Sequence, residues 1–194
     1  MLIDTATAKG SENRFENQLA NHRARKYTRL ENLLRVFWFF GLVVFQLSPR
    51  PFFSFRRNLL KLFGARIGRG VRTYPSTHIY LPWNLSIGNF SSLGEHVLVY
   101  NLGIVAIGER VTISQRAHLC AGSHDYSDPT MPLLKPPIVI EDGVWICTDA
   151  FVGPGVTIRS NAIVAACTVV VKEVAANEIV GGNPAKFIKY RDGR

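Results

Sequence analysis

A repeat with a period of six residues runs through the C-terminal half of the chain. From Ile140 onward every sixth residue is aliphatic, and a small or β-branched residue follows four positions later. The first series is Ile140, Ile146, Val152, Ile158, Val164 and Val170, and the second is Val144, Ala150, Val156, Ala162, Thr168 and Val174. Because six is even, each repeat turns the same side chains inward. A fixed short period is typical of a stacked solenoid, so the pattern predicts a coiled β-helix.

The same period occurs earlier in the chain, with interruptions. Its aliphatic positions include Ile87, Leu93, Val99, Val105, Ile107, Ile113 and Leu119, with a slip of two residues before Ile107, and weaker hexads run from Ile67 through Thr73 to Ile79. Glycine follows several of them, as at Gly68, Gly88 and Gly108, and suits a corner where φ is positive or two backbones approach closely. A β-sandwich is the alternative, but irregular turns between its strands would not keep a phase of six for so long. The prediction is an all-β solenoid over residues 65–175.

The charge of the chain is concentrated in its N-terminal third. The net charge of the 194 residues is +9. Residues 1–72 hold 14 Lys/Arg and 4 Asp/Glu, whereas residues 73–194 hold 9 and 10. No nucleic-acid-binding motif accompanies this charge, so an anionic membrane surface is the better match for a basic and apolar segment.

The N-terminal third divides into two segments. Residues 1–32 are polar and basic, and residues 33–64 are apolar or amphipathic. The uncharged run 36–47 is short for a bilayer span, which takes about 20 residues. Residues 52–63 set Leu59, Leu60 and Phe63 against Arg56, Arg57 and Lys61, which predicts an amphipathic helix that ends at Gly64. Residues 33–64 are expected to cap the solenoid, to bind a membrane interface, or both.

The repeat breaks after His124. Residues 125–139 form an insertion with four prolines, which stiffen it and oppose regular strand pairing. Rigid loops that leave a regular scaffold often carry functional sites. A neutral imidazole at the exit of such a loop can accept a proton near neutral pH, although a surface histidine without a catalytic role is the alternative.

Several motifs together resemble the hexapeptide-repeat acyltransferases, and in particular the galactoside and maltose O-acetyltransferases. They are the segment 122–125, the run Ile140-Glu-Asp-Gly-Val-Trp-Ile146, the run 153–158 and the run Gly181-Gly-Asn-Pro-Ala-Lys186. The N-terminal apolar segment, residues 100–103 and residues 119–126 are similar to the colanic acid biosynthesis acetyltransferase branch. The resemblance covers about residues 59–190. It implies a left-handed β-helix, a homotrimer and acetyl-CoA as the acetyl donor, with no metal.

The resemblance also implies roles for individual residues. His124 matches the catalytic base, and Trp145 matches an aromatic residue that lines the acceptor and pantetheine tunnel. Thr148, Ala166, Lys172 and Lys186 match positions that contact coenzyme A, and a lysine suits the phosphates of this cofactor. Asn101 is a candidate for binding an acceptor hydroxyl or an oxyanion. Residues 176–194 form a C-terminal segment beyond the helix.

The sequence therefore favours an O-acetyltransferase that acts on a sugar, in exopolysaccharide biosynthesis, in the cytoplasm or on the cytoplasmic face of the membrane. The acceptor is a sugar or a lipid-linked saccharide, and nucleic acid is not expected as a partner. Two alternatives remain. One is a zinc lyase similar to the γ-class carbonic anhydrases, which would need His96, His118 and His124 to meet across subunits. The other is a non-catalytic solenoid scaffold at the membrane.

Overall fold

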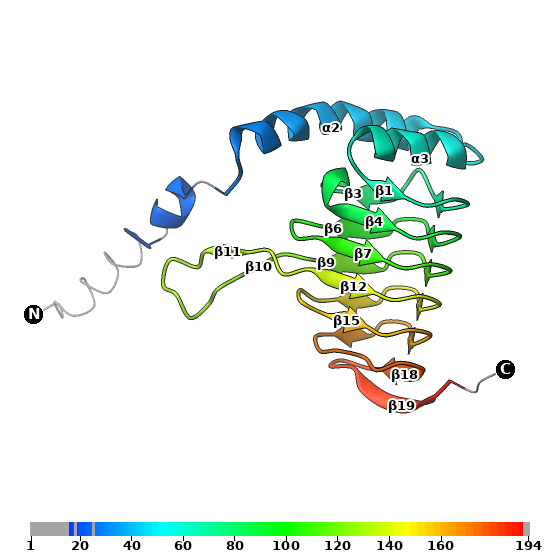
Figure 1. Cartoon of the computed structure of the whole chain (residues 1–194). Coiled ribbons are helices and arrows are strands. Elements are labelled where there is room, and N and C mark those ends of the chain that lie inside the picture. The colour runs from blue at the N-terminus through cyan, green and yellow to red at the C-terminus, as the bar shows by residue number, and fades with distance from the viewer. Residues whose placement is uncertain (1–15, 18, 25, 192–194) are drawn as a thin grey trace, which may run out of the picture.

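The computed structural model describes residues 16–191, apart from residues 18 and 25, and its main body is a three-sided parallel β-solenoid (Figure 1). Sheet 1 contains β1 (Arg66–Ile67), β4 (Leu85–Ile87), β7 (Val105–Ile107), β12 (Ile138–Ile140) and β15 (Thr157–Ile158). Sheet 2 contains β2 (Arg72–Thr73), β5 (Ser92–Leu93), β8 (Thr112–Ile113), β13 (Trp145–Ile146), β16 (Ile163–Val164), β18 (Glu178–Gly181) and β19 (Lys186–Tyr190). Sheet 3 contains β3 (His78–Ile79), β6 (Leu98–Tyr100), β9 (His118–Cys120), β14 (Phe151–Val152) and β17 (Val169–Val170).

The predicted left-handed β-helix is confirmed. In Figure 1 the strands of sheet 1, on the side of the coil nearest the viewer, run from left to right while the coil descends toward the C-terminus, which is a left-handed winding. Ile87, Ile107, Ile140 and Ile158 are stacked in register on successive coils. All six aliphatic residues of the C-terminal series and all six of the second series are buried. The period of six thus marks the residues that fill the interior.

The glycine that follows a ladder residue is explained by close packing of backbones. A Cβ atom on Gly88 would lie 2.5 Å from the carbonyl carbon of Gly108, one coil below. The left-handed backbone conformations occur two residues later in each corner, at Gly70, Phe90, Arg110 and other positions. Of the two reasons expected for glycine, close approach applies at Gly88 and positive φ does not.

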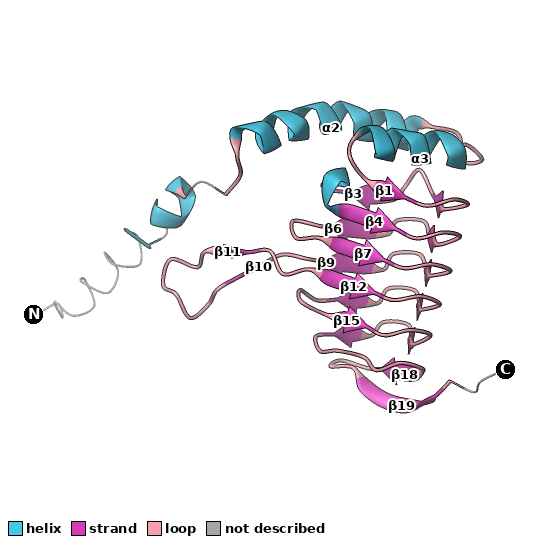
Figure 2. Ribbon diagram, viewed as in Figure 1, coloured by secondary structure: helices cyan, strands magenta, loops and turns pink. Residues whose placement is uncertain are grey.

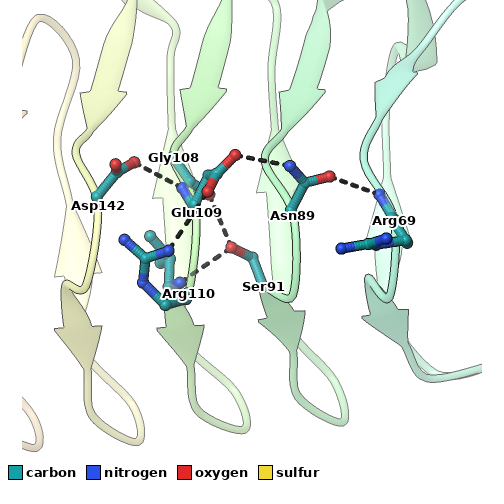
Figure 3. A network of polar contacts seen from close by, with 8 residues as sticks. Arg69, Asn89, Ser91, Gly108, Glu109, Arg110 and Asp142 are labelled. Carbon is teal, nitrogen blue, oxygen red and sulfur yellow. Dashed lines mark hydrogen bonds and ion pairs between the residues drawn. The ribbon is translucent and has the colours of Figure 1, made fainter.

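Polar side chains connect the coils along the corner between sheets 1 and 2 (Figure 3). The Asn89 amide donates to Glu109 Oε1 at 2.6 Å and accepts from the Arg69 backbone N–H at 2.8 Å. The Glu109 backbone N–H donates to Asp142 Oδ1 at 2.7 Å. Ser91 Oγ lies 2.7 Å from the Gly108 carbonyl oxygen. These bonds satisfy backbone groups that the corner leaves outside the sheets.

Two helices close the N-terminal end of the solenoid, α2 (Arg29–Leu47) and α3 (Phe53–Leu62) (Figure 2). Trp38 and Phe45 of α2 and Leu60 of α3 are buried in the same core cluster as the aliphatic ladder. Trp38 Nε1 donates to the Ile79 carbonyl oxygen at 2.8 Å. One face of α2 therefore covers the apolar interior of the first coil, as a solenoid end requires.

Helix α2 begins before the apolar run that predicted it. The Thr28 hydroxyl accepts from the Glu31 backbone N–H at 3.1 Å, and the Glu31 carboxylate accepts from the Thr28 backbone N–H at 2.7 Å. This capping box adds a polar first turn and gives a helix of 19 residues. By length and composition α2 could cross a membrane, but this is weak evidence because core helices and leader segments share these properties.

The prediction that Arg56 lies on the charged face of an amphipathic helix is wrong. Arg56 is fully buried. Its guanidinium donates four hydrogen bonds of 2.6–2.8 Å, to the carbonyl oxygens of Thr73, Pro49 and Arg50 and to the Ser48 hydroxyl. The turn between α2 and α3 wraps around this side chain. Since a guanidinium offers five N–H donors, it can satisfy several backbone carbonyls at once.

Candidate active site

The insertion projects from the solenoid as a narrow hairpin (Figure 1). It contains β10 (Ser123–His124) and β11 (Leu133–Leu134), which pair antiparallel with His124 opposite Leu133. The prolines therefore do not prevent all regular pairing, because β10 precedes all four of them and β11 fits between Pro132 and Pro136. The hairpin rejoins the solenoid at Ile138, where β12 begins, two residues before the predicted boundary.

The tip of the hairpin is fixed by local hydrogen bonds. The Asp125 carboxylate accepts from the Ser127 backbone N–H at 2.9 Å and from its hydroxyl. These bonds lower the pKa of the Asp125 carboxyl below its usual range, so it stays ionised at neutral pH. The Asp128 carboxylate binds Thr130 in the same way. The loop therefore presents His124 on a rigid support.

His124 is exposed, and one of its ring nitrogens is held by the backbone. Nδ1 lies 2.6 Å from the Met131 carbonyl oxygen. A carbonyl can only accept, so Nδ1 carries a hydrogen, and in the neutral ring the lone pair is therefore on Nε2. Met131 has a φ of 46°, an uncommon conformation that turns this carbonyl toward the ring. The contact thus selects the tautomer in which Nε2 is the nitrogen that can accept a proton.

Asn21 supports the same carbonyl from the N-terminal segment. Its Nδ2 donates to the Met131 carbonyl oxygen and to the Thr130 carbonyl oxygen, both at 2.6 Å. Lys135 also reaches this segment, with Nζ 3.1 Å from the Lys26 carbonyl oxygen. Sequence reasoning missed Asn21, because its contacts lie about 110 residues away in the chain.

We expect Asn21→Asp to lower the turnover of this site more than Asn21→Ala does. A carboxylate cannot donate, and it would face two carbonyl oxygens and displace the acceptor of His124 Nδ1. Alanine removes the support without repulsion. Steady-state kinetics of both variants check this, with His22→Ala as a control at an exposed neighbouring position. A role for Asn21 in packing alone predicts the opposite order, since aspartate keeps the shape of asparagine.

Trp145 lies on a different side of the chain from His124. The hairpin leaves the solenoid after β9 of sheet 3 and returns at β12 of sheet 1, so it emerges from the corner between these sheets. Trp145 is in β13 of sheet 2, the face opposite that corner, where Nε1 donates to Ser114 Oγ at 3.0 Å. It is 45% exposed. Although Trp145 is close to the insertion in sequence, a single chain does not bring the two side chains together.

Comparison with known proteins identifies the family of the chain. No family model matches the chain. The protein named as the colanic acid biosynthesis acetyltransferase WcaF of Escherichia coli is 40% identical over 158 residues, which cover 81% of this chain and 87% of WcaF. The chain belongs to the hexapeptide-repeat acetyltransferases. The galactoside O-acetyltransferase of Escherichia coli is 26% identical over 72% of this chain and 70% of its own length.

A solved structure agrees with this assignment. The hexapeptide-repeat acetyltransferase VCA0836 of Vibrio cholerae superposes with a TM-score of 0.80 at 25% identity, covering 86% of this chain and 95% of that one. The same protein has also been solved with acetyl coenzyme A. The predicted family and the predicted enzyme class, an acyltransferase, are thereby confirmed.

The residues expected to bind coenzyme A lie along the C-terminal part of this acetyltransferase. The Thr148 hydroxyl is 3.0 Å from the Gln115 carbonyl oxygen, and Ala166 is exposed in the turn before β17. Lys172 and Lys186 are both exposed, the first just after β17 and the second at the start of β19. Two ammonium groups at this end of the solenoid can meet a phosphate-bearing ligand.

Asn101 is engaged within the fold. It is fully buried, its Oδ1 accepts from the Leu81 backbone N–H at 3.0 Å, and its Nδ2 donates to the Leu81 carbonyl oxygen at 2.6 Å. Both polar groups of the side chain hold the corner before the 3-10 turn Pro82–Asn84. This geometry gives Asn101 a structural role, and we do not include it among the acceptor-binding residues.

The histidines of the zinc-lyase alternative are dispersed in one chain. His96 is exposed in the turn before β6, His118 packs edge to face against Phe151 in sheet 3, and His124 lies on the hairpin. Within residues 16–191, where they are described, no group of three His, Cys, Asp or Glu side chains is placed to hold a metal ion. Burial lowers the pKa of His118 and raises that of the Cys147 thiol. A protonated, half-buried thiol is a poor nucleophile.

Proposed function

We propose that this enzyme transfers an acetyl group from acetyl-CoA to a sugar hydroxyl in exopolysaccharide synthesis, with His124 as the general base. The observation that carries the proposal is the Nδ1 contact with the Met131 carbonyl, which leaves Nε2 able to take a proton. His124 would take the proton of the acceptor hydroxyl while that oxygen attacks the thioester carbonyl. The C–O bond forms, the C–S bond breaks, and the proton passes to the departing thiolate.

Four residues of the C-terminal coils suit acetyl-CoA as the donor. Lys172 and Lys186 would bind the phosphates of acetyl-CoA, and Thr148 and Ala166 would line the path of its pantetheine arm toward Trp145. The names of the relatives support a sugar acceptor, since they include a galactoside O-acetyltransferase and a colanic acid biosynthesis protein. Release of free thiol from acetyl-CoA, assayed with a panel of saccharides, tests the activity. Absence of transfer to every saccharide would contradict it.

We further propose a homotrimer with the active site between chains. His124 and Trp145 lie on opposite sides of one solenoid, so a site that uses both needs the hairpin of one copy and sheet 2 of the next. Cyclic packing of the three-sided coils would repeat this pairing three times.

Mixing two inactive variants checks this arrangement. Trimers reassembled from equal amounts of His124→Ala and Trp145→Ala chains are expected to regain activity, because about one quarter of the shared sites then hold both native residues. Each variant alone should stay inactive at the same total concentration. Light scattering should report three chains. A fully active monomer, or no recovery in mixed trimers, would rule out the shared site.

Finally, we propose that the enzyme attaches to the cytoplasmic face of the membrane through the outer face of α2. Nine of its large apolar side chains are exposed: Leu30, Leu33, Val36, Phe37, Phe39, Phe40, Val43, Val44 and Leu47. The opposite face is packed on the solenoid, so the helix suits a position in the plane of the interface. Acetyl-CoA is a cytosolic donor, which sets the side.

Replacing Phe37 and Phe40 by serine should abolish most co-sedimentation with lipid vesicles. These two rings lie one turn apart on the exposed face. Each substitution removes apolar area that would otherwise enter the boundary between lipid headgroups and acyl chains. Tyr126→Ser, at an exposed aromatic on the hairpin, is the control. In wild type, high salt should weaken binding to anionic vesicles without eliminating it. Equal binding of the double variant and the control would leave α2 as a cap only.

A further inference from the structure

A polar groove on sheet 2 lies between the N-terminal helices and Trp145. Its volume is about 680 Å³. Strands β5 and β8 contribute the small side chains of Ser92 and Thr112, whereas β2 contributes Arg72. Its lining includes Arg50, Arg72, Tyr74, Ser92, Glu95 and Ser114.

The upper end of the groove is basic. Arg72 is exposed on β2, and Arg50 lies in the turn that follows α2, with its guanidinium 5.1 Å from the centre of the Tyr74 ring. Arg50 also forms an ion pair with Glu95 at 3.1 Å, in which the two side chains are 69% and 44% exposed. An exposed pair of this kind contributes little to stability, so Arg50 can turn to an anionic ligand at small cost.

The surface just above this end is apolar. Leu47 at the end of α2 is 79% exposed, and Phe52 and Phe55 beside Arg50 are 52% and 41% exposed. A ligand bound here therefore meets apolar side chains first, then two guanidinium groups, and then a polar groove.

The lower end of the groove reaches the proposed active site. Ser114 lines the groove and accepts the hydrogen bond of Trp145 Nε1. Arg72 and Trp145 are separated by three strand spacings along the order β2, β5, β8 and β13. At about 4.8 Å per spacing this is roughly 14 Å, the length of a diphosphate with one or two sugar rings. The lysines expected to bind the donor lie on the other side of Trp145.

We propose that this groove binds the acceptor, and that the acceptor is a saccharide diphosphate carried on a lipid. This inference rests on the proposed function and specifies its substrate. Arg50 and Arg72 bind the diphosphate, the lipid chain lies against Leu47, Phe52 and the membrane, and the saccharide extends down the groove to Trp145. The groove length then selects which sugar ring, counted from the diphosphate, reaches His124 of the neighbouring copy.

Binding of farnesyl diphosphate to the full-length enzyme tests the basic end without any need for the natural saccharide. Titration calorimetry is done with saturating coenzyme A, which occupies the phosphate site of the donor. Wild type should bind farnesyl diphosphate, and Arg72→Ala should weaken this binding about tenfold or more, as expected for loss of a charge-assisted contact. Arg66→Ala removes the same charge from an exposed position on β1 of sheet 1 and should leave binding unchanged. Equal effects of the two variants, or no binding by wild type, would overturn the inference.

A second variant blocks the groove and keeps both arginines. Ser92 is partly exposed on β5 and lines the groove, so Ser92→Tyr should exclude a saccharide from the floor. It should raise the KM of a prenyl-diphosphate-linked disaccharide and leave the affinity for farnesyl diphosphate nearly unchanged. Unchanged KM would place the acceptor elsewhere.

Three acceptors test whether the diphosphate that the groove binds belongs to a lipid carrier or to a nucleotide. The same disaccharide is offered as a prenyl diphosphate, as a nucleotide diphosphate and as a methyl glycoside. The prenyl form should have the lowest KM, and only the two diphosphates should respond to Arg72→Ala. A lowest KM for the nucleotide form would overturn the lipid assignment. Transfer to the methyl glycoside that is insensitive to Arg72→Ala would uphold the proposed acetyltransferase even if the groove inference failed.

Discussion

His124→Ala is expected to reduce acetyl transfer by about 10²–10⁴-fold, the usual contribution of general acid–base catalysis. The side chain is exposed on the hairpin and is held through Nδ1 by the Met131 carbonyl, away from the buried ladder, so its loss should not disturb that ladder. His124→Asn should be almost as inactive, because an amide can replace the hydrogen bond but cannot accept the proton. Steady-state kinetics give the change in turnover.

Two controls accompany this variant. His96→Asn changes another exposed histidine in the same way, at a position with φ of 58° that asparagine tolerates, and should keep full activity. Coenzyme A binding to His124→Ala, measured by calorimetry, should remain close to wild type, because its proposed contacts are elsewhere. If His124→Ala retains more than about a tenth of the turnover, the loss is smaller than general-base catalysis provides. His124 would then not be the base.

The solenoid was predictable because its physical cause is local and repeated. A side chain every six residues must fill the interior of each coil, so the period is written directly in the sequence, as at Ile140, Ile146 and Val152. The family motifs added the winding and the enzyme class. The corner asparagine and acid that link neighbouring coils, Asn89 and Glu109, follow the same repeat (Figure 3).

The candidate site could be predicted only in part, because its geometry depends on contacts between distant segments. Trp145 follows the insertion closely in sequence, yet the coil carries it to the face opposite the hairpin. Asn21 reaches the hairpin from the N-terminal segment, and no sequence pattern indicates that contact. The start of α2 has a sequence signature, since Thr28 and Glu31 form a capping box, whereas the aromatic run marks only residues 36–47 of the helix.

The burial of Arg56 also depends on contacts that the sequence pattern does not reveal. We expect Arg56→Met to lower the free energy of unfolding by at least about 3 kcal/mol. A basic residue among apolar ones on a helical pattern predicts exposure, and only the folded turn between α2 and α3 supplies the carbonyls that make burial favourable. Methionine fills similar space but removes the donors of two buried and two partly buried acceptors, and each buried acceptor left unpaired costs about 1–3 kcal/mol. Arg56→Lys should recover only part of the loss, because one ammonium cannot replace the planar fork of donors.

Urea unfolding measures the change, and Lys61→Met, at an exposed position of the same helix, should alter stability by less than about 0.5 kcal/mol. Hydrogen exchange should show that the loss of protection in Arg56→Met is concentrated in α2 and α3, because the lower coils do not contact this side chain. A change no larger than that of the control would mean that the buried guanidinium does not hold the cap in place.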